Sequence, residues 1–150
     1  MREPGHRGPS GPQRARYGHG VYPGYDELVR AAEATVRRYS PAEAIDVAGE
    51  PGVLFVDVRD AVELLEGVIS GATHASRGRL EAHLDPNNSR YVSELDDAAE
   101  IVFYCASGAR SALAARRAQE LGYDRVRYLD GGITAWTDAG GQRQVISNSR

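Results

Sequence analysis

The sequence predicts an α/β fold: a central parallel sheet of about five strands with helices on both faces. Two observations predict it. Apolar runs typical of strands buried on both faces occupy residues 53–58, with Asp57 near the end, and residues 101–105, and residues 126–129 are a further predicted strand. Each run is followed by a turn of small or polar residues and then by a segment of helical character. Strands and helices that alternate in this way form right-handed crossovers, which make the sheet parallel.

Length, charge and cysteine content limit the function classes. The 150 residues suit one domain, and a net charge of −3 gives no reason to expect nucleic acid or an anionic membrane as partner. All 18 positively charged residues are arginine, which excludes enzymes that need a lysine Schiff base. The single cysteine excludes an internal disulfide or resolving thiol. Without a long apolar run or a signal-peptide segment, we expect a cytoplasmic protein.

The N-terminal region is predicted to have two parts. Residues 1–24 are rich in Gly, Pro, Arg and His and have almost no aliphatic side chains to bury, so we expect a disordered tail. A helix is expected over residues 25–39, because apolar side chains recur there at helical spacing: Leu28, Val29, Ala32, Val36 and Tyr39.

The next elements alternate between helix and strand. Ser40-Pro41-Ala42-Glu43 has the residues of a capping box, so a short helix to about Ala48 should follow. After the strand at 53–58, we expect helical turns at 61–66, a short strand at 72–75, a helix at 77–84 and a short helix within 91–99.

The C-terminal third repeats the alternation. The strand that ends at Cys105 is followed by a helix over residues 110–121, which Gly122 should close. The strand at 126–129 leads through Asp130-Gly131-Gly132 into a helix over 133–139, and residues 142–150 are expected to be a tail.

Cys105 is the candidate nucleophile. A lone cysteine is often only a small buried hydrophobe. Here, however, it stands between a strand and the start of a helix, across a loop of small residues, Ala106-Ser107-Gly108-Ala109. Backbone N–H groups and the positive end of a helix stabilise a thiolate at such a place. In parallel sheets, sites form beyond the carboxyl ends of the strands, where Asp57 and Asp130 are also expected.

Three motifs occur in order. The first is Asp57-Val58-Arg59 followed by Glu63 and the segment 67–74, the second is Cys105 to Arg110, and the third is Leu129 to Trp136. Together they resemble the rhodanese (sulfurtransferase) family in its single-domain form. The resemblance covers roughly residues 40–141, which we expect to form a rhodanese-like domain.

The resemblance implies a mechanism and a set of site residues. The Cys105 thiolate would take the outer sulfur of a donor such as thiosulfate or 3-mercaptopyruvate and pass it to cyanide or a thiol, including the thiol of a thioredoxin-like or sulfur-acceptor protein. The residues implied to bind the persulfide or the substrate are Ala106, Ser107, Gly108, Ala109, Arg110 and, in the segment after the short strand, Arg77. No cofactor or metal is expected.

Several roles are open from the residues alone. Arg110 could hold an anionic donor or lock the loop through Glu63 or Asp57, and the two roles are compatible. Asp57 and Arg59 are expected to support the site, because a carboxylate at a strand end usually pairs with N–H groups or an arginine. Arg77 is equally consistent with a solvent-facing side chain.

The sequence departs from the family pattern at three positions. Similar sequences usually carry His or Arg where Val68 stands and Pro where Ser70 and Ser76 stand. These positions shape the segment that leads to Arg77, at the rim of the pocket.

Three functions compete with a sulfurtransferase. A phosphatase or arsenate reductase of related fold has five residues between Cys and Arg, whereas four intervene here. A non-enzymatic binding module of the same fold is the second competitor, although many such modules lack the cysteine that this chain has. The third is a persulfide carrier that delivers sulfur to a partner protein, and it would use the same residues as the enzyme.

Overall fold

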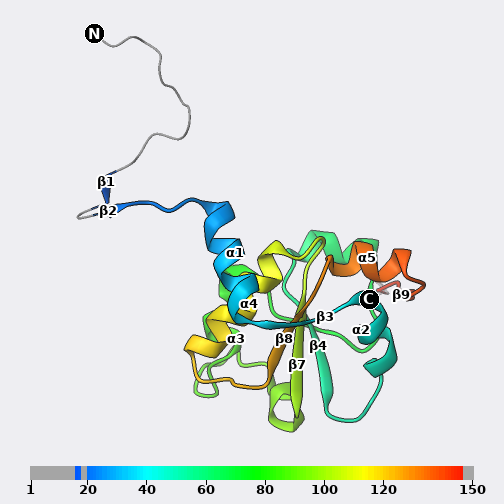
Figure 1. The fold of residues 1–150 in the computed structure, drawn as a ribbon. Coiled ribbons are helices and arrows are strands. Elements are labelled where there is room, and N and C mark those ends of the chain that lie inside the picture. The colour runs from blue at the N-terminus through cyan, green and yellow to red at the C-terminus, as the bar shows by residue number, and fades with distance from the viewer. Residues whose placement is uncertain (1–15, 18–19, 147–150) are drawn as a thin grey trace.

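A computed structural model describes residues 16–17 and 20–146 of the chain (Figure 1). The central sheet has five parallel strands in the order β3-β8-β7-β4-β6, as predicted. Its strands are β3 (Arg37–Tyr39), β4 (Val53–Asp57), β6 (Thr73–His74), β7 (Glu100–Tyr104) and β8 (Val126–Leu129).

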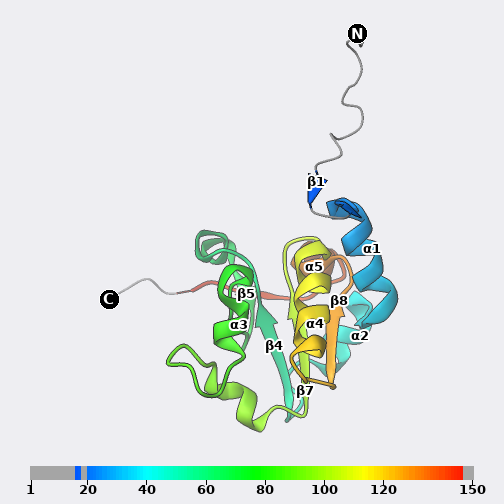
Figure 2. The ribbon, with the colours of Figure 1, turned by 90° about the vertical axis from the view of Figure 1, so that its left-hand side faces the viewer.

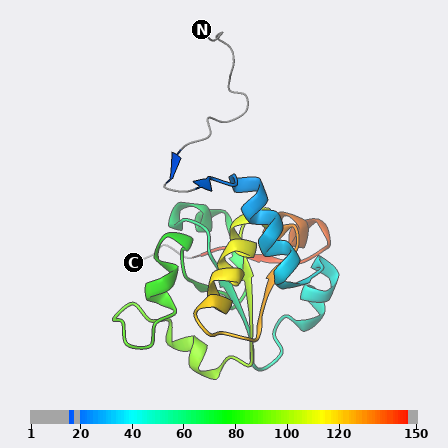
Figure 3. The ribbon, with the colours of Figure 1, turned by 60° about the vertical axis from the view of Figure 1, so that its left-hand side comes forward.

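Helices cover both faces of this sheet (Figures 2 and 3). Helix α4 (Ala109–Glu120) packs on β7 and β8, with α1 (Tyr25–Thr35) against it, and α3 (Leu80–His83) contributes to the same core. Helices α2 (Pro41–Val47) and α5 (Gly132–Asp138) pack together on the opposite face. Short 3₁₀ turns complete the domain: η1 (Ala61–Glu66), η2 (Arg77–Arg79) and η3 (Ser93–Asp97). Within the described ranges, no helix is long and apolar enough to cross a membrane.

Local signals in the sequence fix several boundaries. The Ser40 hydroxyl accepts a hydrogen bond from the Glu43 amide, and the Glu43 carboxylate accepts one from the Ser40 amide, so the predicted capping box begins α2. On the same face, Trp136 of α5 is buried and meets Phe55 of β4 edge to face at 5.8 Å between ring centroids. The capping box therefore fixes the start of α2, and the ring contact holds α5 against β4.

The N-terminal helix is shorter than predicted. Helix α1 ends at Thr35, and Arg37–Tyr39 form the edge strand β3, paired with Arg127–Leu129 of β8. The prediction of a helix over residues 25–39 was therefore wrong at its end. Val36 and Tyr39 fit a helical apolar face, but strand pairing satisfies the backbone groups of this segment instead.

Both predicted tails contain strands. Residues 1–15 and 18–19 of the expected disordered segment 1–24 lie outside the described residues, but β1 (Arg16–Tyr17) pairs antiparallel with β2 (Gly20–Val21). In the expected tail 142–150, β9 (Arg143–Gln144) pairs antiparallel with β5 (Val68–Ile69). Such two-residue strands have no hydrophobic period, so only the pairing partner defines them.

Candidate active site

Cys105 lies directly after β7, at the carboxyl ends of the parallel strands. The residue is 1% exposed, and the loop after it leads into α4 at Ala109. Gly108 precedes the helix in a left-handed conformation, with φ of 116°. A Cβ atom there would also lie 3.3 Å from the Gly131 nitrogen, so glycine suits this position on two counts.

Two backbone N–H groups point at the sulfur. The Gly108 nitrogen lies 3.1 Å from Cys105 Sγ, and the Ser111 nitrogen lies 3.4 Å from it. Ser111 Oγ is also 3.5 Å from the sulfur. Gly108 is among the residues that the family resemblance implied for persulfide binding, whereas Ser111 was missed.

The start of α5 fixes the orientation of the loop. The amides of Ile133 and Thr134 donate to the carbonyl oxygens of Cys105 and Ala106, at 2.9 and 3.1 Å. Because C=O and N–H point in opposite directions across a trans peptide, the N–H groups of Ala106 and Ser107 point away from α5. The motif at Asp130 to Gly132 therefore matters because it brings α5 against the loop.

Close approach explains why glycine begins α5. A Cβ atom on Gly132 would lie 2.3 Å from the Ala106 oxygen and 2.6 Å from the Cys105 oxygen. No side chain fits in that space. Gly132 therefore allows the backbone of α5 to contact the backbone of the cysteine loop.

Arg110 is held by Glu63. Its two terminal nitrogens lie 2.8 and 2.9 Å from the two carboxylate oxygens, and both side chains are about one-third exposed or less. Glu63 also accepts from the Asp60 amide at 3.1 Å, which fixes it at the start of η1. The hydrogen bonds from Arg110 lower the pKa of Glu63 to about 2. The same bonds, with a contribution from Cys105, raise the pKa of Arg110. Of the two carboxylates that the sequence left open, Arg110 therefore pairs with Glu63.

A buried ion pair lies at the end of β4. Asp57 and Arg59 are each 1% exposed. The Arg59 amide and side chain donate to the Asp57 carboxylate at 2.8 to 3.2 Å, and its guanidinium also donates to the Gly67 oxygen at 2.8 Å. This is the pairing expected for Asp57, and it ties β4 to the segment after η1.

Neighbouring polar groups extend this network. The Tyr104 hydroxyl accepts from the Ile69 amide at 3.0 Å. Burial, and then the nearby charge of Asp57, raise the pKa of this hydroxyl far above its usual range. The ring nitrogen Nε2 of His74 lies 2.7 Å from the Arg59 oxygen. The network therefore joins β4, β6 and β7 and includes Tyr104, the residue before Cys105.

Arg77 is not among the groups that contact the sulfur. Its guanidinium lies 4.0 Å from Glu81, and its side chain lines a hollow of about 250 Å³ with Leu28, Leu113 and other residues of α1 and α4. The structure therefore does not bring Arg77 to Cys105 in the way that it brings Gly108 and Ser111 there.

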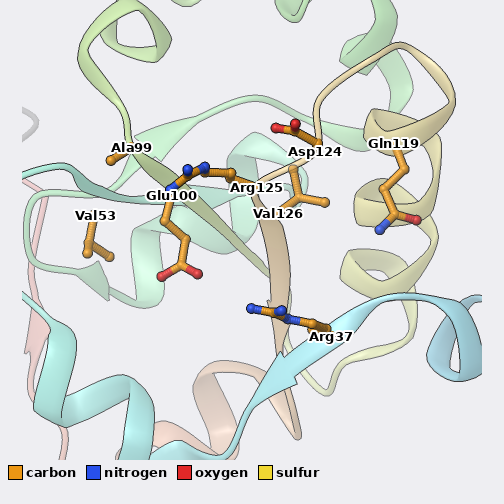
Figure 4. Close-up of a pocket in the computed structure, with 8 residues that line it drawn as sticks. All are labelled: Arg37, Val53, Ala99, Glu100, Gln119, Asp124, Arg125 and Val126. Carbon is orange, nitrogen blue, oxygen red and sulfur yellow. The ribbon is translucent and has the colours of Figure 1, made fainter.

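A larger hollow lies at the amino ends of the central strands, opposite the end at which Cys105 lies (Figure 4). It measures about 560 Å³ and is lined by Val53, Glu100 and Val126, at the amino ends of their strands, with Arg37 among other residues. Glu100 is already paired with Arg127 at 2.8 Å and accepts from the Tyr39 hydroxyl. None of the predicted site residues lines this hollow.

The sequence contains a feature that could have identified Ser111 as a residue with a buried hydrogen-bond partner. It is a polar residue in the first turn of α4, on the face otherwise formed by buried alanines, and it is itself fully buried. A buried hydroxyl requires a hydrogen-bond partner. Its partner is the loop, since Oγ donates to the Gly108 oxygen at 3.0 Å.

Several known proteins are similar to this chain in sequence. The rhodanese-like domain family matches residues 40–139. A sulfurtransferase of Allochromatium vinosum is 38% identical over 94 residues, which cover 63% of this chain and 80% of the relative. A thiosulfate:glutathione sulfurtransferase of Saccharomyces cerevisiae is 29% identical over 117 residues, covering 73% of this chain and 84% of the relative.

A solved structure has a similar fold over most of the chain. It is a protein of unknown function from Rhodopseudomonas palustris, described as a possible tyrosine phosphatase. It is 34% identical, with a TM-score of 0.78, and the match covers 86% of this chain and all of that one.

Proposed function

The chain belongs to the rhodanese-like family, and we propose that it is a sulfurtransferase that carries a sulfane sulfur as a persulfide on Cys105. The observation that supports this most directly is the geometry of the sulfur. Cys105 Sγ lies at the start of α4 with two backbone N–H groups within hydrogen-bonding distance, and Arg110 follows in the same turn. Such donors stabilise a thiolate and a negatively charged sulfur bound to it.

The reaction divides into two balanced steps. The Cys105 thiolate attacks the outer sulfur of thiosulfate, a new S–S bond forms, and sulfite leaves with the electron pair of the bond that breaks. Cyanide or an acceptor thiolate then attacks the outer sulfur of the persulfide. The Cys105 thiolate leaves with its electron pair and is ready for another cycle. Neither step needs an external oxidant or reductant.

The roles of the surrounding residues follow from their contacts. The amides of Ala106 through Arg110 would bind the outer sulfur, and those of Ala106 and Ser107 point away from the carbonyls that α5 holds. Arg110 uses one hydrogen on each terminal nitrogen for Glu63, so three of its five donors are left for an anionic donor. The Arg59 guanidinium, paired with Asp57, lies 5.8 Å from the Tyr104 ring, so we expect this pair to support the residue before Cys105. Arg77, which lies against α1 and α4, is the least supported of the predicted binding residues.

One relative and the state of the cysteine bear on the acceptor and the compartment. The yeast relative is named for transfer to glutathione, which favours a small thiol as the acceptor here, although a protein thiol would react in the same way. Cys105 is a free, buried thiol, which favours a reducing compartment, so the cytoplasm remains our prediction.

Phosphatase activity is the second candidate, because the structurally similar Rhodopseudomonas palustris protein is described as a possible tyrosine phosphatase. The loop argues against it. Only four residues separate Cys105 from Arg110, and Gly108 is already 3.1 Å from the sulfur. A ring this tight suits a single sulfur atom better than a tetrahedral phosphate.

Intact mass spectrometry after incubation with thiosulfate tests the proposal. The wild type should gain one sulfur and release it to cyanide as thiocyanate. Cys105→Ser should gain none, because a hydroxyl needs a base to activate it and, among the described residues, the hydrogen-bond contacts of this side chain are the amides of Gly108 and Ser111 and the Ser111 hydroxyl. The emission of Trp136, the single tryptophan, verifies that the variant is folded.

Three outcomes separate the candidate functions. Sulfur uptake by Cys105→Ser would overturn the role of Cys105. Hydrolysis of an aryl phosphate without sulfur uptake would support the phosphatase. A persulfide that forms but reacts with neither cyanide nor small thiols would indicate a carrier that delivers sulfur only to a partner protein.

A further inference from the structure

We propose that Ser111 is a catalytic residue whose hydroxyl changes hydrogen-bond direction during the reaction. It accepts a hydrogen bond from Cys105 when the sulfur is a thiol and donates one when the sulfur is a thiolate. This inference rests on the proposed function, since the thiolate is the nucleophile of the first step and the leaving group of the second.

The contacts of Ser111 form a closed ring with the cysteine loop. Ser111 Oγ lies 3.5 Å from Cys105 Sγ and 3.0 Å from the Gly108 oxygen. The sulfur in turn accepts from the Gly108 amide at 3.1 Å and the Ser111 amide at 3.4 Å. With the hydroxyl hydrogen on the Gly108 oxygen, a lone pair of Oγ is free to accept the thiol hydrogen.

The hydroxyl hydrogen can leave the Gly108 oxygen at little cost. That oxygen also accepts from the Ala112 amide at 3.0 Å, as the first backbone bond of α4. The Gly108 carbonyl therefore remains paired when Ser111 turns away from it. Rotation about the Cβ–Oγ bond moves only the hydrogen, so the change needs no rearrangement of the buried side chain.

Ionisation of the sulfur favours this rotation. A thiolate has no hydrogen to donate, so the Ser111 oxygen loses the hydrogen that it accepted, and the negative sulfur becomes a stronger acceptor than the Gly108 carbonyl. Donation from Ser111 raises the number of donors on the sulfur from two to three. A hydrogen bond to an ionised group shifts an equilibrium by roughly ten- to a hundredfold.

Other titratable groups lie on the elements around the loop, and Arg110 among them interacts electrostatically with Cys105. They stay unchanged in every variant below, so differences between the variants report on Ser111. On the adjoining elements these groups are Arg110, Glu63, Asp60, Asp57, Arg59, Tyr104, His74 and Asp130.

The pH dependence of alkylation tests the proposal. Cys105 is the single cysteine, so iodoacetamide labelling followed by mass spectrometry reports on it alone. In Ser111→Ala, the midpoint of the rate profile should move about one to two pH units higher. Release of sulfur from the persulfide to cyanide should slow by roughly ten- to a hundredfold, because the leaving thiolate has lost a donor.

Two further variants serve as controls. Ser111→Thr keeps a hydroxyl and should retain the wild-type profile. Ser93→Ala removes an exposed hydroxyl at the start of η3 and should change nothing. Trp136 emission and the thermal midpoint establish that each variant is folded before its rates are compared.

The outcomes distinguish this inference from the proposed function. A folded Ser111→Ala whose profile overlaps that of the wild type overturns the role of Ser111, even where Cys105→Ser has confirmed sulfur transfer. A folded Ser111→Thr that shifts as far as Ser111→Ala also overturns it, because the hydroxyl is then not the cause. If the profile shifts in Ser111→Ala alone but the wild type takes up no sulfur, the hydroxyl role stands and the proposed function fails.

Discussion

Removal of the Asp57 carboxylate should destabilise this protein far more than removal of an exposed carboxylate. In Asp57→Asn, the Arg59 guanidinium remains buried without its counter-charge, and both side chains are only 1–2% exposed in the native pair. Loss of one partner of a buried ion pair costs about 3–5 kcal/mol. Since a domain of this size has a total stability of about 5–15 kcal/mol, the variant should lose a large part of it.

The loss is measurable through the single tryptophan. Urea unfolding followed by Trp136 emission gives the free energy of unfolding, because Trp136 is buried against Phe55. The melting temperature should fall by about 6–20 °C, from about 2–4 °C for each kcal/mol in a domain of this size. The deficit should persist in 1 M salt, because buried charges are little screened.

Glu81→Gln is the matched control. Glu81 pairs with Arg117 at a similar distance, 2.9 Å, but these side chains are 48% and 38% exposed. An exposed pair of this kind contributes about 0.2–1 kcal/mol. If Asp57→Asn costs no more than Glu81→Gln, the buried pair is not what stabilises the end of β4, and the reasoning fails.

Two further predictions concern the loop. Arg110 holds the pKa of Glu63 at about 2, against 4.5 for an ordinary glutamate, so the carboxylate stabilises the fold above about pH 4.5 and this contribution is lost as the pH falls toward 2. The difference in unfolding free energy between wild type and Glu63→Gln should therefore shrink between pH 5 and pH 2 in urea titrations, and a constant difference would contradict the clamp. Gly132→Ala should reduce thiosulfate:cyanide activity at least tenfold, because its Cβ would lie 2.3 Å from the Ala106 oxygen. The control Gly78→Ala has open space around the new methyl group and should retain activity. Equal activity of the two variants in steady-state assays would refute the packing argument.

The sequence determined the central part of the fold. The apolar runs at β4 and β7 are long enough to show burial on both faces without reference to a partner. Their order with the helices fixed a parallel sheet, and a parallel sheet places the strand ends, and thus Asp57 and Cys105, at one edge. The cysteine loop could be recognised because a nucleophile, small residues and a helix start are adjacent in the chain.

Tertiary structure decided the features that depend on a distant partner. Arg37–Tyr39 is a strand because β8 pairs with it, although its own side chains fit a helix. Arg110 had two candidate carboxylates, and the position of η1 against the loop selected Glu63 over Asp57. Ser111 became a contact of the sulfur because the turn at Gly108 folds the first residues of α4 back over Cys105. The pattern of apolar and polar residues predicts which segments are buried, because polarity is a property of each side chain by itself. Hydrogen bonds and ion pairs join groups that only the folded chain brings within about 3 Å of each other.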